Sequence, residues 1–215
     1  MIDYEYQKEA NISCLFEDKE YEERRISCFE VVKAFQKVGI RFGIACSFNL
    51  FLRGLVDEFH DFDIIVDIND IDKVEKIMQE LGAEAVSTGG NGFCESEVYI
   101  NYHLGRVDFD IISGFRVLTY GTSFLYQYSS EEIEEIKIFE EEIISIPLIS
   151  LEALYLLYSM MEGWQPKRRF KRLIIQKILF EKKEDMKFKG ILEDSLKKQN
   201  LPGWIKREVR RLIND

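Results

Sequence analysis

Residues 42–67 read FGIACSFNLFLRGLVDEFHDFDIIVD, a stretch that combines an apolar segment, a small-residue turn, a helix start and two closely spaced acids. Asp61 and Asp63 alternate with apolar residues, after which the sequence becomes purely apolar. Because side chains alternate between the faces of a β-strand, the pattern predicts a strand that enters a core with both carboxylates on one face. Such carboxylates repel each other and raise each other's pKa unless a cation lies between them. We therefore expect a cation site at Asp61 and Asp63.

The residues before the two acids predict a strand, a turn and a helix in direct succession. Residues 40–44 (IRFGI) alternate as a short strand does, and Ser47 is the expected N-cap of a helix with the apolar residues of 48–55. Such a junction directs backbone N–H groups and the positive end of a helix dipole outward, where they bind phosphates. We therefore expect Ser47 and the N–H groups around it to hold phosphate.

A later stretch repeats the acidic alternation. Residues 107–112 read VDFDII, so Asp108 and Asp110 also lie on one face of an expected strand. Both acids have apolar neighbours on either side. The alternation therefore gives a second pair of acids on one strand face.

The composition describes an ordered globular protein of acidic character. Its 215 residues, 46% of them hydrophobic, suffice for one large domain with a full core. The net charge of -10 argues against a protein that grips long nucleic acid by neutralising phosphates, since that mode requires a basic surface. We therefore expect small or locally bound partners and no long nucleic acid.

Several features predict a cytoplasmic protein. The cysteines show no C-x-x-C pairing and no histidine at zinc-finger spacing, so we expect reduced thiols at Cys14, Cys28, Cys46 and Cys94. The first residues, MIDYEY, contain no basic region followed by an apolar one, and we expect no signal peptide. No apolar run approaches the roughly 20 residues that a membrane span requires, and we expect no membrane association. No feature of the sequence indicates an oligomeric state.

The pattern from Ser150 onward becomes helical, with Ser150 as the expected N-cap of the first helix. A later helix carries in its first turns the densest positive cluster of the chain, which includes Lys167, Arg168 and Lys171. Such a compact cluster is unusual in an acidic chain, and a solvated helix face is one interpretation of it.

The order of these segments resembles the nucleotidyltransferase superfamily of the DNA polymerase beta type. Residues 45–47 (ACS) match the position of its first signature, a Gly-Ser or Gly-Gly pair after an apolar residue. Asp61 and Asp63 match its first acidic pair, and its third acid falls at Asp108 or Asp110. We favour Asp110, because the sequence DIISGF that begins there resembles the way this strand leaves the site in small bacterial members.

A second similarity concerns the C-terminal part. Residues 146–152 (IPLISLE), followed by a helix and a basic helix, resemble small bacterial enzymes that adenylylate aminoglycosides or lincosamides. The two similarities imply an α/β (α+β) fold with a nucleotidyltransferase-like mixed sheet flanked by helices, and with a helical C-terminal extension. We expect the boundary between residues 1–147, the nucleotidyltransferase-like domain, and residues 148–215, the helical region.

The resemblance implies a metal-dependent nucleotidyltransferase. Such an enzyme moves a nucleoside monophosphate from a nucleoside triphosphate to a hydroxyl of a small molecule, for example an antibiotic, or of a protein. Asp61, Asp63 and Asp110 would bind magnesium, with two ions expected, since Mg²⁺ prefers hard oxygen ligands. Asp110 or Asp108 would help to deprotonate the acceptor hydroxyl.

Phosphate binding is assigned to two further groups by the resemblance. Ser47 and the turn at Cys46 would hold the β and γ phosphates at the helix start. Lys167, Arg168 and Lys171 would bind the triphosphate tail.

Cys46 departs from the family pattern, because this position is glycine in the family. Glycine lets the backbone approach the phosphates, whereas a side chain obstructs them or forces a less favourable turn. The alternative function is therefore a catalytically degenerate nucleotidyltransferase-fold protein that binds a nucleotide or a partner protein without turnover. A third class is an interaction protein that uses the Glu-rich residues 131–142 or the helical tail.

Overall fold

The computed structural model describes residues 4–88, 95–119, 121–139, 142–163 and 165–214. These residues form a seven-stranded mixed sheet in the order β3-β4-β5-β2-β1-β9-β8, and β6 and β7 form a separate two-stranded sheet. The strands are β1 (Phe42–Ile44), β2 (Phe62–Val66), β3 (Glu84–Thr88), β4 (Val98–Leu104), β5 (Val107–Ser113), β6 (Phe115–Thr119), β7 (Thr122–Tyr126), β8 (Ile133–Phe139) and β9 (Ile143–Ile149).

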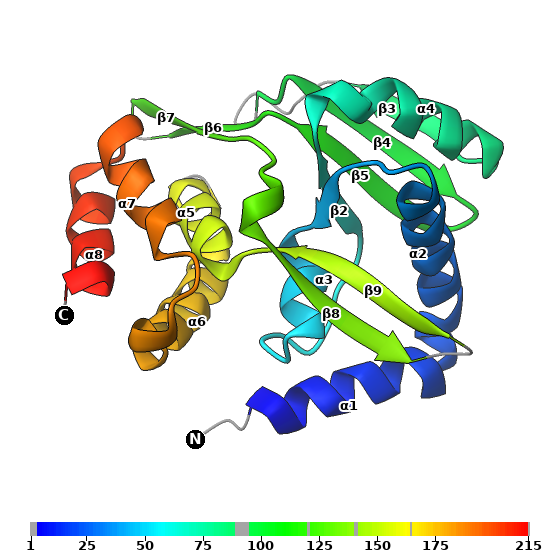
Figure 1. Cartoon of the computed structure of the whole chain (residues 1–215), viewed down its shortest axis with the longest axis horizontal. Coiled ribbons are helices and arrows are strands. Elements are labelled where there is room, and N and C mark those ends of the chain that lie inside the picture. The colour runs from blue at the N-terminus through cyan, green and yellow to red at the C-terminus, as the bar shows by residue number, and fades with distance from the viewer. Residues whose placement is uncertain (1–3, 89–94, 120, 140–141, 164, 215) are drawn as a thin grey trace.

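Helices flank the main sheet, and α5 to α8 (yellow to red) gather beside it, away from α2 and α4 (Figure 1). This arrangement confirms the expected mixed sheet flanked by helices, with a helical C-terminal region. The helices are α1 (Tyr4–Glu17), α2 (Lys19–Lys37), α3 (Cys46–Leu52), α4 (Ile71–Glu80), α5 (Leu151–Met161), α6 (Arg168–Glu181), α7 (Lys189–Lys198) and α8 (Gly203–Asn214), with short 3-10 turns η1 (Ile68–Asp70), η2 (Ser130–Glu132) and η3 (Lys183–Asp185).

The centre of the sheet is formed by β2. This strand pairs antiparallel with β1 and parallel with β5, while β1 pairs parallel with β9. The parallel register of β2 and β5 aligns Asp63 with Asp110. Two acids that are 47 positions apart in sequence are thereby brought onto neighbouring strands.

The alternation along β2 and β5 divides the core into two layers. On one face, Phe62 and Phe109 pack in a cluster that includes residues of α2 and α4. On the other face, Ile65 and Ile112 pack in a cluster that includes most of α5. The acidic residues of both strands share the parity of this second pair, so they lie on the face turned toward α5.

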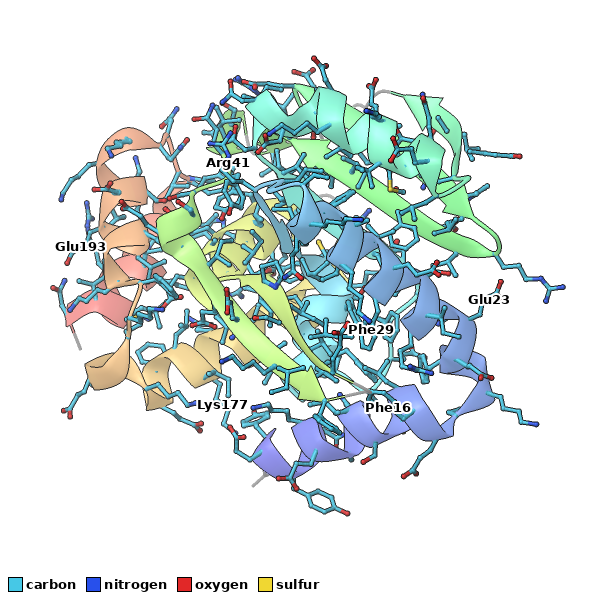
Figure 2. All side chains as sticks on the ribbon, turned by 45° about the vertical axis from the view of Figure 1, so that its right-hand side comes forward. Phe16, Glu23, Phe29, Arg41, Lys177 and Glu193 are labelled. Carbon is cyan, nitrogen blue, oxygen red and sulfur yellow. The ribbon has the colours of Figure 1, made fainter. Side chains whose placement is uncertain are left out.

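The N-terminal helices form a corner beside this core. Phe16 of α1 and Phe29 of α2 lie together across the corner, with ring centroids 6.5 Å apart (Figure 2). The buried Asn11 of α1 donates hydrogen bonds from Nδ2 to the backbone carbonyls of Phe51 and Val56, at 2.7 and 2.8 Å. These bonds fix α1 against the segment that follows α3.

The two helix starts expected from the sequence have different outcomes. Ser150 caps α5 as predicted, since its Oγ accepts the backbone N–H of Ala153 at 3.3 Å. The N-cap prediction for Ser47 is wrong, because α3 begins at Cys46 and Ala45 takes the N-cap position without a side-chain bond. The backbone N–H of Ala45 donates a hydrogen bond to the carbonyl of Asp63, at 2.8 Å, which extends the contact between β1 and β2 up to Ala45. The chain turns directly after this bond, so the helix begins one residue before Ser47.

Two further expectations concern cysteines and membranes. Cys14, Cys28 and Cys46 are free thiols, while Cys94 lies outside the described residues. Within the described part of the chain, none of the helices is both long and apolar enough to cross a bilayer.

Candidate active site

The acid face of β2 and β5 forms the centre of the site. Asp63 and Asp110 are half-buried and lie directly opposite each other in the parallel ladder. Burial raises the pKa of the Asp63 carboxyl, and the nearby charges of Asp61 and Asp110 raise it further. The structure thus brings together the carboxylates that the alternation predicted on one face. Because these carboxylates repel each other, a cation bound at this face would stabilise their charged forms.

The two acids of β5 differ in their surroundings. Asp110 accepts a hydrogen bond from Asn101 Nδ2 at 2.7 Å and another from the Tyr99 hydroxyl. Burial raises the pKa of Asp110, although these two bonds oppose the shift. Asp108 is instead half-exposed and forms an ion pair with His103. Asp110 therefore belongs to the acid face beside Asp63, while Asp108 is engaged with the neighbouring strand.

The turn between β1 and α3 places Cys46 and Ser47 beside the acids. Cys46 is buried and has φ 49°, in the left-handed region that favours glycine. Its thiol lies close enough to the Asp63 carboxylate to stabilise the charged form through a hydrogen bond. Ser47 Oγ donates to Asp61 Oδ1 at 3.4 Å, a long bond that links the first turn of α3 to the start of β2.

Helix α6 supplies the positive charge on this face. The Arg168 guanidinium and the Lys171 ammonium lie over the Tyr158 ring, at 5.7 and 5.9 Å from its centroid. Burial and the neighbouring Arg168 lower the pKa of Lys171, while Asp63 and Asp61 oppose the shift. The two cations are therefore within electrostatic reach of the acids. Lys167 is more exposed and precedes the helix.

A cavity of about 1020 Å³ joins several of these groups. Five of the predicted residues line it, namely Ser47, Asp61, Lys167, Arg168 and Lys171. The lining also includes Tyr4 and Gln7 of α1 and the acidic pair Asp57 and Glu58, which follows α3. Asp63, Asp110 and Cys46 are not part of the lining. The cavity is large enough for a nucleotide together with part of an acceptor.

Some residues of the site escaped the reading of the sequence. The buried ring of Tyr158 lies below both cations, Arg168 and Lys171. Because its sequence neighbours in α5 are mostly apolar, the sequence indicates only a core residue at this position. Asn49 is fully buried and donates to the backbone carbonyls of Ile44 and Ile149, both at 2.8 Å. A lone asparagine inside an apolar helix was the available signal, because a buried amide requires partners. These bonds hold α3 against the ends of β1 and β9.

The residues present can be compared with the needs of a magnesium ion. Among the described residues, no three His, Cys, Asp or Glu side chains form a group that could hold a metal ion by themselves. Asp63 and Asp110 nevertheless supply hard oxygen ligands from adjacent strands, and Mg²⁺ is commonly bound by one or two carboxylates plus substrate phosphates. The donor set therefore fits a metal that arrives with a nucleotide better than a metal held by the protein alone.

Solved structures resemble this fold at low sequence identity. A Thermotoga maritima protein (TM1012), described as a candidate nucleotidyltransferase, is 17% identical with a TM-score of 0.52, covering 71% of this chain and 92% of that chain. A structure of ANT(2'')-Ia in complex with adenylyl-2''-tobramycin is 11% identical with a TM-score of 0.49, covering 74% of this chain and 90% of that chain. The lincosamide antibiotic adenylyltransferase LnuA, with lincomycin bound, is 17% identical with a TM-score of 0.45, covering 70% of this chain and 95% of that chain. The likeness to the Thermotoga protein concerns the fold alone.

Sequence comparison identifies the family. None of the curated proteins matches the chain. A family model described as aminoglycoside-2''-adenylyltransferase matches residues 27–174, which include the acid face, the turn at Cys46 and the cations of α6. This range is well over half of the chain, and it confirms the resemblance predicted from the sequence. The chain belongs to the aminoglycoside-2''-adenylyltransferase family.

Proposed function

We propose that this protein transfers a nucleoside monophosphate from a nucleoside triphosphate to a hydroxyl of a small molecule. The observation that carries the proposal is the alignment of Asp63 with Asp110 on a sheet face that has Arg168 and Lys171 within electrostatic reach. Nucleotidyl transfer brings together a metal-bound triphosphate and a hydroxyl that must lose a proton. Carboxylates can bind the metal and accept the proton, and cations can bind the phosphates.

The reaction proceeds by in-line displacement at the α-phosphorus. The acceptor oxygen forms a bond to phosphorus while the bond to pyrophosphate breaks, and Asp110 accepts the hydroxyl proton. The raised pKa of Asp110 brings it closer to working pH, as suits a general base. Asn101 and Tyr99 hold its carboxylate in place by donating hydrogen bonds.

Phosphate binding is assigned to the turn and to α6. Ser47 and the backbone N–H groups at the start of α3 bind the β and γ phosphates. Arg168 and Lys171, with Lys167 at the rim, bind the triphosphate tail and offset the charge of the departing pyrophosphate. The Tyr158 ring keeps two of these cations in position.

We propose magnesium as the metal, bound together with the nucleotide, with Asp63 and Asp110 as ligands from adjacent strands, Asp61 as a further ligand once the triphosphate is present, and two ions as the proposed number. When bound, Mg²⁺ offsets the negative charge that builds up on the phosphoryl oxygens. The carboxylates of the protein would hold the ion and thereby orient the triphosphate. The positive charge of the ion would also relieve the repulsion between Asp63 and its acidic neighbours.

The proposed acceptor is a hydroxylated small molecule with positive charge, as an aminoglycoside is. The family description supports this class. The cavity wall carries the acids Asp57 and Glu58 in addition to the cations, and the whole chain has a net charge of -10. An acidic wall attracts a cationic acceptor and repels nucleic acid.

One observation favours a second candidate function, nucleotide binding without turnover. Cys46 stands where the family has glycine, and it keeps the left-handed backbone that glycine would adopt without strain. Its side chain is buried beside Asp63, at the turn assigned to the phosphates. A nucleotide displaced by this thiol would bind in an orientation that is unfit for in-line attack.

Product analysis separates the two candidates. We would incubate the protein with magnesium and each of the four nucleoside triphosphates, together with a panel of aminoglycosides and lincosamides, and search for nucleotidylated antibiotic by mass spectrometry. Turnover predicts one such adduct with equimolar pyrophosphate. Lys171→Gln should lower kcat/KM by about 10- to 100-fold through loss of phosphate stabilisation. Arg169→Gln, on the same helix but exposed and outside the cavity lining, should leave it unchanged.

Absence of any adduct would remove the transferase proposal for the tested acceptors. If the same preparation binds nucleotide tightly, binding without turnover becomes the better account.

A further inference from the structure

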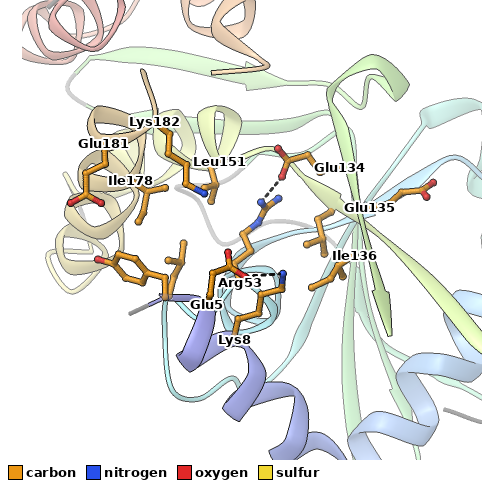
Figure 3. Close-up of a pocket in the computed structure, with 13 residues that line it drawn as sticks. Glu5, Lys8, Arg53, Glu134, Glu135, Ile136, Leu151, Ile178, Glu181 and Lys182 are labelled. Atoms are coloured by element: carbon orange, nitrogen blue, oxygen red, sulfur yellow. Dashed lines mark hydrogen bonds and ion pairs between the residues drawn. The ribbon is translucent and has the colours of Figure 1, made fainter. Parts of the chain in front are cut away.

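A second cavity, of about 630 Å³, lies on the side of α3 away from its N-terminus (Figure 3). Its walls come from the start of α1, the segment that ends α3, the edge of the sheet at β8 and β9, and the ends of α5 and α6 that face it. The volume falls in the range of about 300 to 1,000 Å³ that is typical of small-molecule sites. None of the predicted active-site residues lines it.

The cavity offers a broad apolar surface. Leu55, Ile136, Leu148, Leu151 and Ile178 converge on it from five different elements or segments. Contact with such side chains stabilises a bound apolar group by about 25 cal/mol per Å² of surface removed from water. The shape therefore favours a ligand with an apolar body.

The charged side chains that point into the cavity include more cations than carboxylates. The Arg53 guanidinium forms an ion pair with Glu134, and Lys8 Nζ lies 3.6 Å from Glu5 Oε2 (Figure 3). Lys182 directs its ammonium group toward the middle of the cavity and has no hydrogen-bond or ion-pair partner among the described residues. The inward groups thus comprise three cations and two carboxylates.

The other two carboxylates of the lining do not compensate for this excess. Figure 3 shows the carboxylates of Glu135 and Glu181 pointing away from the middle of the cavity. Glu135 Oε2 accepts a hydrogen bond from Ser145 Oγ at 2.7 Å, and Glu181 Oε1 lies 3.7 Å from Lys177 Nζ. The inward surface therefore carries one uncompensated positive charge, at Lys182.

We propose that this cavity binds an amphipathic monoanion, with its apolar body on the aliphatic side chains and its anionic head group at Lys182 and Arg53. Arg53 is well placed for this contact because its Nε donates to Asn49 Oδ1 at 2.8 Å, which holds the guanidinium in one orientation. A fixed guanidinium loses little side-chain entropy when an anion binds. The cavity shares Tyr4 and Leu55 with the cavity of about 1020 Å³ that contains Ser47 and the cations of α6, which we call the catalytic cleft, so the two sites are neighbours.

The test uses anilinonaphthalene sulfonate, a fluorescent amphipathic monoanion, titrated into the folded full-length protein. We expect saturable binding at one site, displaced by octanoate and not by octylammonium, because only octanoate carries the complementary charge. Lys182→Gln should weaken binding by about tenfold, as loss of one charge-assisted contact does. Lys183→Gln removes a charge from the adjacent exposed position outside the lining and should leave the affinity unchanged.

Three results would overturn the proposal. Equal affinities of the Lys182→Gln and Lys183→Gln proteins would show that the inward ammonium does not bind the probe. Displacement by octylammonium as effective as by octanoate would show that the charge of the ligand does not matter. Competitive displacement by magnesium nucleotide would assign the probe to the catalytic cleft. Lys171→Gln, which tests the transferase proposal, alters no residue in the lining of this cavity, so the two proposals fail independently.

Discussion

Cys46 holds the turn between β1 and α3 with φ 49°, a conformation that costs an L-residue about 1 to 2 kcal/mol. The bond from the Ala45 N–H to the Asp63 carbonyl fixes the chain before this turn, and α3 fixes it afterwards. The surrounding structure therefore imposes the glycine-like backbone on a cysteine. Its thiol is buried beside Asp63, where a phosphate is expected to bind.

Cys46→Gly is predicted to improve nucleotide binding. Glycine adopts this φ without strain and opens the approach to the backbone N–H groups. We expect the affinity for magnesium nucleotide to rise about 3- to 10-fold, as a gain near 1 kcal/mol implies. Cys46→Ala removes the thiol but keeps the Cβ and the strained φ, so it should recover only part of this gain in affinity. Calorimetric titration of the three proteins measures this, and equal affinities would show that the side chain does not obstruct phosphate.

The sequence predicted which acids share a strand face, but it did not predict the residues that contact them. The acid-apolar alternation in residues 61–66 was enough to place two carboxylates on one face, because the strand period is two. The same period could not separate Asp108 from Asp110, which share a face. The choice depends on register with β2 and on Asn101, and both are tertiary contacts. The φ angle of Cys46 likewise depends on a tertiary contact, the hydrogen bond between Ala45 and Asp63.

The connection between η1 and α4 is held by a single buried carboxylate. Asp70 accepts hydrogen bonds from the backbone N–H and Nε of Arg41, at 3.1 and 2.9 Å, and from Lys73 Nζ at 2.7 Å. Although burial opposes the shift, the bonds from Lys73 and Arg41 lower the pKa of Asp70 to about 2. The unfolded chain lacks these bonds, so its Asp70 pKa returns to about 4.

This difference predicts a pH-dependent stability. Because the folded pKa lies below the unfolded one, the contribution of Asp70 is complete above about pH 4 and is lost as the pH falls toward 2. We expect Asp70→Asn to lower the free energy of unfolding by about 1 kcal/mol at pH 7, since solvent screens the exposed Arg41 and Lys73. Urea unfolding of both proteins at pH 7 and pH 3 measures it. A difference that stays the same at both values would contradict the assignment.

Elements with strong periodicity were predictable, and those without it were not. The helical pattern from Ser150 onward and its serine cap were read directly from the sequence. Residues 115–140 mix tyrosines and a Glu-rich stretch with isoleucines and are hard to assign from sequence, yet they contain β6, β7 and β8. In β8 one face is largely exposed and the other is half-buried with only Ile138 fully buried, and the apolar Phe139 lies on the exposed face, so the alternation in the sequence is weak. Its place is set by pairing with β9, which the local sequence does not encode.

The molecule as a whole joins the sheet to the C-terminal helices through one core. Ile65 and Ile112 from the acid face cluster with Leu154 and Tyr155 of α5 and with Ile205 of α8. All five side chains are almost completely buried. The boundary expected between residues 147 and 148 stays a prediction about sequence organisation, because this core crosses it.

A shortened chain is predicted not to fold alone. Residues 1–149 lack α5, so the acid face would expose its apolar residues to water at about 25 cal/mol per Å². We expect the fragment to keep secondary structure but to lose cooperative thermal unfolding and amide chemical-shift dispersion. Circular dichroism and proton–nitrogen correlation spectra, recorded beside the full chain, measure both properties. A sharp transition in the fragment would show that the sheet is an independent domain.

The central claim is that Asp63 and its neighbours bind a nucleotide through magnesium, and calorimetric titration with a non-hydrolysable triphosphate analogue tests it most directly. The account predicts that the unchanged protein and the Asp72→Asn control, altered at an exposed acid of α4, bind the analogue with magnesium and lose at least about tenfold in affinity without it. Asp63→Asn should bind equally weakly in both conditions. Equal affinity of the unchanged protein with and without magnesium would contradict the account.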